Sequence, residues 1–177
     1  MAATILQGAI VTGLTVFLVL IQASFMKPEV SRVMAAGGAG TWFTFGYVMY
    51  IIVGVMGMAM SALFYHYLEN MLGKRIRGSA KALAWIHIVL MNVGTAAAMG
   101  LLMYAGYLGG ASMLPADVGG RGFNGGQAHE VLVSFVVPIS AAILLIVAGG
   151  VGFLATYISH NRGANLTKAG STEARAT

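Results

Sequence analysis

The sequence contains no cysteine, so disulfides, iron–sulfur clusters, c-type haem attachment and thiolate metal sites are all excluded within this chain. Charged residues are also scarce, at 8% of the chain, and only five of them are acidic. All five lie between apolar stretches or at their ends. Because a transporter usually needs a charged side chain near the membrane midplane, we expect neither a channel nor a carrier.

Apolar residues, in contrast, make up 58% of the chain. They form long runs at residues 3–26, 42–68, 82–108 and 130–158, and each run exceeds the roughly 20 residues needed to cross a hydrocarbon core of about 30 Å. Barrel strands would be shorter and would alternate in polarity. The sequence therefore predicts an all-α integral membrane protein with four transmembrane helices in a single domain, residues 1–160, followed by a polar, disordered tail, residues 161–177.

Lysine and arginine are distributed unevenly between the predicted loops. Of the ten, seven lie in the 69–81 loop or the C-terminal tail, and three lie in the other two loops. The seven are Lys74, Arg75, Arg77, Lys81, Arg162, Lys168 and Arg175. Because basic residues favour the cytoplasmic side, we expect both termini and the 69–81 loop in the cytoplasm, and the chain in the cell membrane. These charges set topology and do not form a surface for nucleic acid.

Proline, glycine and other small residues predict where helices end, bend and pack. Pro28 should end the first helix because its ring cannot continue the hydrogen-bond ladder, and Pro138 should kink the fourth. We expect a flexible loop at 29–41, and a glycine-rich loop at 109–128 that is either mobile or ordered by a partner. Small residues four apart predict close packing of helices in lipid. They are Gly57 and Ser61, Gly94 and Ala98, and the cluster of Gly149, Gly150 and Gly152.

His66 and His87 are the candidate site residues. Counting from Glu69 and Lys81 at about 1.5 Å per residue places both histidines inside the cytoplasmic interface, on neighbouring antiparallel helices where they can lie close together. Such a pair can bind a haem, a copper ion or a proton. Alternatively, each donates one ring N–H to a backbone carbonyl or to a neighbouring subunit. We favour the second interpretation, because a haem between the two rings would require helices spread apart, whereas the small residues draw them together.

Methionine is abundant, with twelve residues in the chain. Met56 and Met60 share one helix face, and so do Met99 and Met103. Thioethers can hold Cu(I), but methionine at helical spacing more often fills space between helices. We therefore expect packing residues and no metal site.

Two segments carry a resemblance to a known family. The segment YVMYIIVGVMGMAMSALFYHYLENMLGK (47–74), followed by LAWIHIVLMNVG (83–94), resembles the tenth and eleventh helices of subunit I of haem-copper oxidases. The matching positions are Tyr50, Gly54, Tyr65, Tyr67, Met71, Gly73, Lys74, Ile86, His87, Leu90, Met91 and Gly94. The following LGGASMLP and the last helix resemble the twelfth helix of that family more loosely.

The departures from this family concern its cofactors. In the tenth helix of the family, a His-x-His pair ligates the two haems, and those two positions are Tyr47 and Met49 here. Tyrosine and methionine each ligate haem in other proteins, but the family's own ligands are both missing. The resemblance thus implies a relative that keeps the helical scaffold without the cofactors, and His87 matches a histidine that the family does not use as a haem ligand.

We therefore expect a non-catalytic accessory subunit of a membrane redox complex, with a haem-copper terminal oxidase as the first candidate for that complex. It would not be an enzyme by itself and would carry no cofactor, and it would dock on other membrane subunits and lipid through its second and third helices. Asn92 and Thr95 would contact partner helices. One alternative is an accessory subunit of a membrane copper monooxygenase of the ammonia or methane type. Another is a small cytochrome in which His66 and His87 hold haem b. The sequence indicates no soluble substrate.

Overall fold

The computed structural model describes residues 2–73 and 76–173 of the chain, with side chains described as far as residue 158. In these residues the chain is helical and has no strand. Four helical spans are long and apolar enough to cross a membrane. They are Ala2–Phe25, Gly40–Met71, Ser79–Ser112 and Gly125–Ile158. The prediction of four long apolar helices is thus confirmed, and three of them run a few residues further than predicted.

Two of these spans change helix type along their length. The first consists of α1 (Ala2–Val16), the π-helical turn η1 (Phe17–Ile21) and α2 (Gln22–Phe25). The second consists of α4 (Gly40–Met49), the π-helical stretch η2 (Tyr50–Gly57), α5 (Met58–His66) and the π-helical turn η3 (Tyr67–Met71). The third is α6 (Ser79–Ser112). The fourth is the first part of α7 (Gly125–Glu173), which follows the short 3-10 turn η4 (Ala116–Val118).

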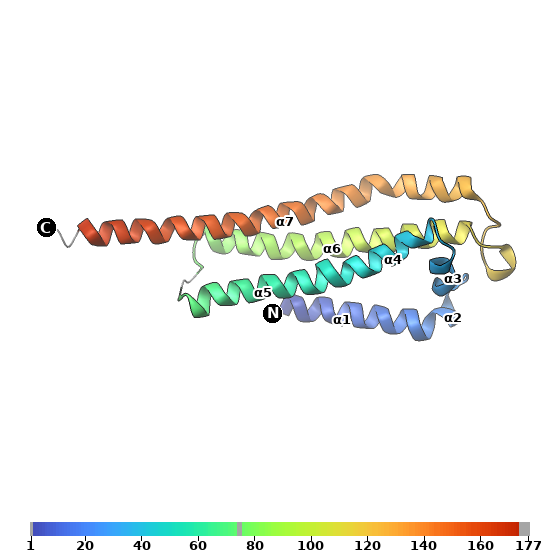
Figure 1. Ribbon diagram of the computed structural model, residues 1–177, viewed down its shortest axis with the longest axis horizontal. Helices are drawn as coiled ribbons and strands as arrows, with labels where there is room; N and C mark the ends of the chain where they lie inside the picture. The colour runs from blue at the N-terminus through green and yellow to red at the C-terminus, as the bar shows by residue number, and fades with distance from the viewer. Residues whose placement is uncertain (1, 74–75, 174–177) are drawn as a thin grey trace.

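α7 continues beyond the fourth span. Its backbone is helical as far as Glu173, so residues 161–173, which the sequence predicts as part of a disordered tail, extend this helix (Figure 1). The boundary at residue 160 stays a prediction, and residues 174–177 lie outside the described part of the chain. Pro138 lies inside α7, and this helix bends along its length (Figure 1).

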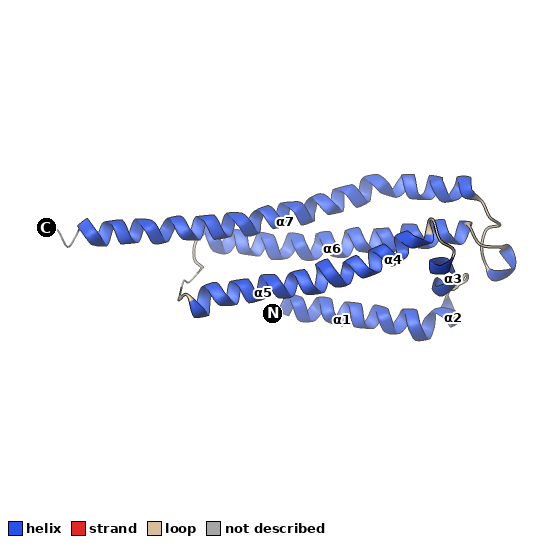
Figure 2. Cartoon of the chain, in the orientation of Figure 1, coloured by secondary structure: helices blue, strands red, loops and turns tan. Residues whose placement is uncertain are grey.

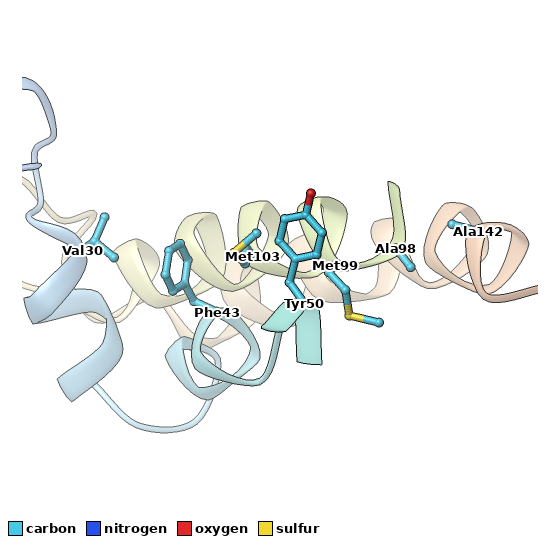
Figure 3. Close-up of a cluster of buried hydrophobic side chains, with 7 residues drawn as sticks. All are labelled: Val30, Phe43, Tyr50, Ala98, Met99, Met103 and Ala142. Carbon is cyan, nitrogen blue, oxygen red and sulfur yellow. The ribbon is translucent and has the colours of Figure 1, made fainter. Parts of the chain in front are cut away.

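α6 is the central helix of the bundle. It packs along α7 on one side and along α4 on the other, while α1 lies against η2 and α5 (Figures 1 and 2). A cluster of buried apolar side chains fills the contacts around α6 (Figure 3). Its members are Val30, Phe43, Tyr50, Ala98, Met99, Met103 and Ala142. Many large apolar side chains on the outside of all four spans are exposed, as expected for helices that face lipid.

The connection between the first two spans is not a flexible loop throughout, which corrects the expectation from the sequence. It contains α3 (Val30–Ala35), in which Val30 and Val33 are 1% and 0% exposed. Residues three apart lie on the same helix face, so burial of these two valines holds α3 against the bundle. A helix of six residues is too short to show a hydrophobic period in the sequence.

The glycine-rich loop is ordered by its own backbone. The Arg121 N–H donates to the carbonyl of Ala111 (3.0 Å), and the Asn124 N–H donates to the carbonyl of Ser112 (2.7 Å). Gly119 has φ +88°, a left-handed conformation that glycine adopts without strain. The expectation of a mobile or partner-ordered loop is therefore corrected, since the loop folds back onto the last turn of α6 through bonds within the chain.

α4 and α6 approach each other closely because each has a glycine at their contact. A Cβ built at Gly46 of α4 would lie 3.0 Å from the backbone nitrogen of Met103. A Cβ built at Gly106 of α6 would overlap the backbone nitrogen of Phe43 and lie 2.8 Å from its Cα. The two helix backbones are therefore in direct contact, and a larger residue at either glycine would separate them.

A second reciprocal pair joins α6 to α7. A Cβ at Gly94 would lie 2.9 Å from the backbone nitrogen of Ile146, and a Cβ at Gly149 would lie 3.1 Å from that of Met91. The predicted packing role of Gly94 and Gly149 is thus confirmed. Gly150, in contrast, has open space where a side chain would be. The spacing of small residues predicts such contacts, but it does not indicate which member of a run faces a neighbour.

Candidate functional site

Three spans meet at a chain of polar side chains, which we call the Gln7 network: Gln7 and Tyr50, which are buried, and Asn92, which is partly buried. The Tyr50 hydroxyl donates to Gln7 Oε1 (2.7 Å), and Gln7 Nε2 donates to Asn92 Oδ1 (2.8 Å). Asn92 Nδ2 donates to the carbonyl of Ile88 (2.7 Å). Gln7 and Tyr50 are 3% and 4% exposed. Because polar groups away from water are costly unless they are hydrogen-bonded, this network ties α1, η2 and α6 into one unit.

The sequence predicts that Asn92 and Thr95 contact partner helices, but Asn92 bonds within this chain and Thr95 is buried inside it. Asn92 bonds to Gln7 of α1. Thr95 is completely buried, and its hydroxyl has no hydrogen-bond partner among the described residues. The Gln7 network was not predicted from the sequence. Its one signal was a glutamine in an otherwise apolar first helix, which in lipid requires a polar partner on another helix.

His87 lies in an aromatic cluster between α5, α6 and α7. It is 2% exposed, and its Nδ1 is 2.8 Å from the hydroxyl of Tyr65. The ring of Phe153 packs against both residues, with centroid distances of 5.0 Å to His87 and 5.8 Å to Tyr65. His87 is therefore a buried packing residue whose hydrogen-bond partner is a tyrosine on the neighbouring helix, and not a backbone carbonyl.

His66 lies in different surroundings. Its side chain is exposed, and its Nδ1 accepts a hydrogen bond from Asn70 Nδ2 (2.8 Å). It lines a hollow between α1 and α5 whose other walls include Thr4 and Ala62. This hollow could not be predicted from the sequence, because the direction in which His66 points depends on how α5 packs in the folded bundle.

His66 and His87 have no bonding partner in common. Consecutive residues on a helix point about 100° apart, so when Tyr65 reaches His87, its neighbour His66 is turned away toward α1. A haem held by two histidines needs both rings directed at one iron. The hypothesis of a haem between these two residues therefore gains no support from their positions.

Tyr47 and Met49, which the sequence comparison above aligned with a family's haem ligands, both make contacts within the bundle. The Thr15 hydroxyl donates to the carbonyl of Val11 (2.8 Å), so the Tyr47 hydroxyl, 2.6 Å away, is the donor to Thr15. Met49 is partly buried against the apolar core. These positions therefore join α4 to α1 and to the core.

Potential metal ligands are dispersed. Within residues 2–73 and 76–158, no three His, Cys, Asp or Glu side chains come together in a group that could hold a metal ion. Met99 and Met103 are buried in the core, which confirms their packing role, whereas Met56 and Met60 are 59% and 70% exposed on the outside of the second span. The methionines of this span thus belong to an outer apolar surface.

No protein-family model, no curated protein and no solved structure matches the chain. Inside the bundle, polar groups of different spans bond to one another. Large apolar side chains cover the outside of the bundle. A proposal for the function rests on these contacts.

Proposed function

We propose that the chain is a non-catalytic accessory subunit of a membrane redox complex, that it acts through helix packing, and that its host is a haem-copper terminal oxidase. The observation that carries this proposal is the direct contact of helix backbones inside the bundle. Gly46 and Gly106 bring α4 onto α6, and Gly94 and Gly149 bring α6 onto α7. Helices at this distance leave no space for a haem between them. Because the contacts lie within this chain, the bundle is a preformed scaffold for other subunits.

The choice of host is supported by the two segments that resemble the oxidase helices. They fall on the second span and on the first half of α6, which are packing neighbours. A scaffold that lacks the family's haem ligands can use their positions for contacts, as Tyr47 and Met49 do. The competing host is a membrane copper monooxygenase, and the partner found by the experiment below distinguishes the two.

The orientation we propose follows the charges. Arg77 lies in the connection from η3 just before α6, and Lys81 lies in the first turn of α6. With the other basic residues of that loop and of the C-terminal region, they place this end of the bundle in the cytoplasm by the positive-inside rule. The α3 connection and the glycine-rich loop would then face the outside of the cell membrane.

Docking is assigned to the outer face of the second span. Its large exposed apolar side chains recur every three or four residues and so form one stripe. They are Trp42, Phe45, Val48, Ile52, Met56 and Met60. At the outer end of the stripe lies a hollow of about 600 Å³, lined by Thr41, Trp42, Thr44, Phe45 and Val48. A partner helix would place a side chain there.

A photo-crosslinking amino acid at Phe45, introduced in cells that assemble the complex, tests this assignment. We expect a covalent adduct with a catalytic oxidase subunit, identified by mass spectrometry. The matched control is the same amino acid at Val147 of α7, which is exposed to a similar degree (56% against 55%) and should give no protein adduct. Equal adducts at both positions, or none at Phe45, would contradict docking at this face.

A further inference from the structure

Two adjoining hollows lie between the start of α1 and α5. Their volumes are about 250 Å³ and 380 Å³, and both are lined by Thr4, Ala62 and His66. We call them together the α1–α5 cleft. Small-molecule sites usually measure about 300–1,000 Å³, so the cleft has the size of a ligand site. It belongs neither to the Gln7 network nor to the docking stripe's outer hollow.

One wall of the α1–α5 cleft is polar and offers both donors and acceptors. Because Nδ1 of His66 accepts from Asn70, the neutral imidazole carries its proton on Nε2, which is then free to donate. The carboxylate of Glu69 is an acceptor. A ligand that both accepts and donates hydrogen bonds would satisfy these groups.

The opposite wall is apolar and opens outward. It is lined by Ile5, Ala59 and Leu63, and Ile5 and Leu63 are 69% and 65% exposed. In a membrane this side would face the acyl chains. The cleft is thus polar at one end and continuous with lipid at the other, which fits an amphiphile whose tail leaves sideways into the bilayer.

The charges of the cleft narrow the class of ligand. None of its described lining residues is lysine or arginine, so these residues offer a phosphate head group no cation, and Glu69 would repel it. An uncharged ring with carbonyl or hydroxyl oxygens matches the donors and the acceptor. We propose that the α1–α5 cleft binds an isoprenoid quinone or its quinol, with the ring at His66 and Glu69 and the tail along Ile5 and Leu63. The site does not depend on the host complex, because all of its residues belong to this chain.

Photolabelling of the full chain tests this proposal. The probe is a decyl-tailed quinone with a photoreactive azide on its ring, and the chain is held in phosphatidylcholine nanodiscs. We expect the label on residues 58–70, and we expect unlabelled decylubiquinone to compete with it. Ala62→Phe, which fills the cleft, and His66→Ala, which removes the donor, should each lower the labelling about tenfold, the effect of losing one well-made contact.

Matched controls change the same residue types elsewhere. Ala141 lies on the outside of α7 and His129 lies near its start, and both residues are exposed. The substitutions Ala141→Phe and His129→Ala should therefore change the labelling less than about twofold. Circular dichroism and gel filtration show which variants fold, and either cleft variant alone decides. The proposal is overturned if the folded cleft variants label like the controls, or if phosphatidylethanolamine displaces the probe as well as decylubiquinone does, since the cleft would then be an ordinary lipid site.

Discussion

Replacing Gly106 with leucine is expected to destabilise the bundle by about 3 kcal/mol, the upper end of the usual cost of overpacking a core. The reason is geometric: a Cβ at this position would overlap the backbone of Phe43. Backbone, unlike the end of a flexible side chain, cannot rotate away, so α4 and α6 would have to separate. Separation would also expose the buried contacts that surround Gly46 on the opposite helix.

Gly100→Leu is the matched control for Gly106→Leu. Gly100 lies on the same helix, and no neighbouring atom is within 4 Å of a Cβ built there. Leucine has the higher helix propensity, by up to about 1 kcal/mol, so this change should leave the bundle at least as stable as the native chain. Unfolding by sodium dodecyl sulfate in mixed micelles, followed by circular dichroism, measures both. Equal stability of the two variants would mean that α4 and α6 are not in backbone contact.

Replacing Gln7 with leucine is expected to cost about 1–3 kcal/mol, because it leaves the buried Tyr50 hydroxyl and the partly buried Asn92 amide without their partner. Interhelical hydrogen bonds in membranes average about 0.6 kcal/mol, so most of this loss reflects the groups left behind. The additional change Asn92→Leu should therefore cost less in the Gln7→Leu background than in the native chain.

The same unfolding measurement tests the Gln7 network, with the four proteins compared as a double-mutant cycle. Thr12→Val is the control on the same helix, since this exposed hydroxyl bonds only to the carbonyl of Gly8. It should change stability by less than about 0.5 kcal/mol. Strict additivity of Gln7→Leu and Asn92→Leu would show that the two amides do not interact.

The spans were predictable because their signal is long and local. Each apolar run exceeds a membrane's thickness, and that property belongs to the sequence alone. The helical rotation was not predictable, because it depends on which neighbours a helix meets. His66 and His87 illustrate this: their depth could be counted along the chain, but the contact of Tyr65 with His87, which turns His66 toward α1, exists only after packing.

The short helix α3 and the hydrogen bonds of the glycine-rich loop were also not predictable from the sequence. The two buried valines of α3 look like ordinary loop residues until the bundle exists to bury them. The glycine-rich loop is held by backbone hydrogen bonds such as that from Asn124 to Ser112. Nearly every residue has the same backbone groups, so the identity of a residue does not indicate such a bond. In contrast, Gly94 and Gly149 were found because small residues at helical spacing have few other uses in lipid.

The central claim, that this chain is a scaffold without a haem of its own, is tested most directly by the visible absorption spectrum of the tagged chain, purified from its native membrane in mild detergent and then separated from its partners. We predict that the chain co-purifies with haem-copper oxidase subunits and that the separated chain has no Soret band. A Soret band that stays with the separated chain, and that is lost in His66→Ala or His87→Ala, would contradict the account and establish a cytochrome.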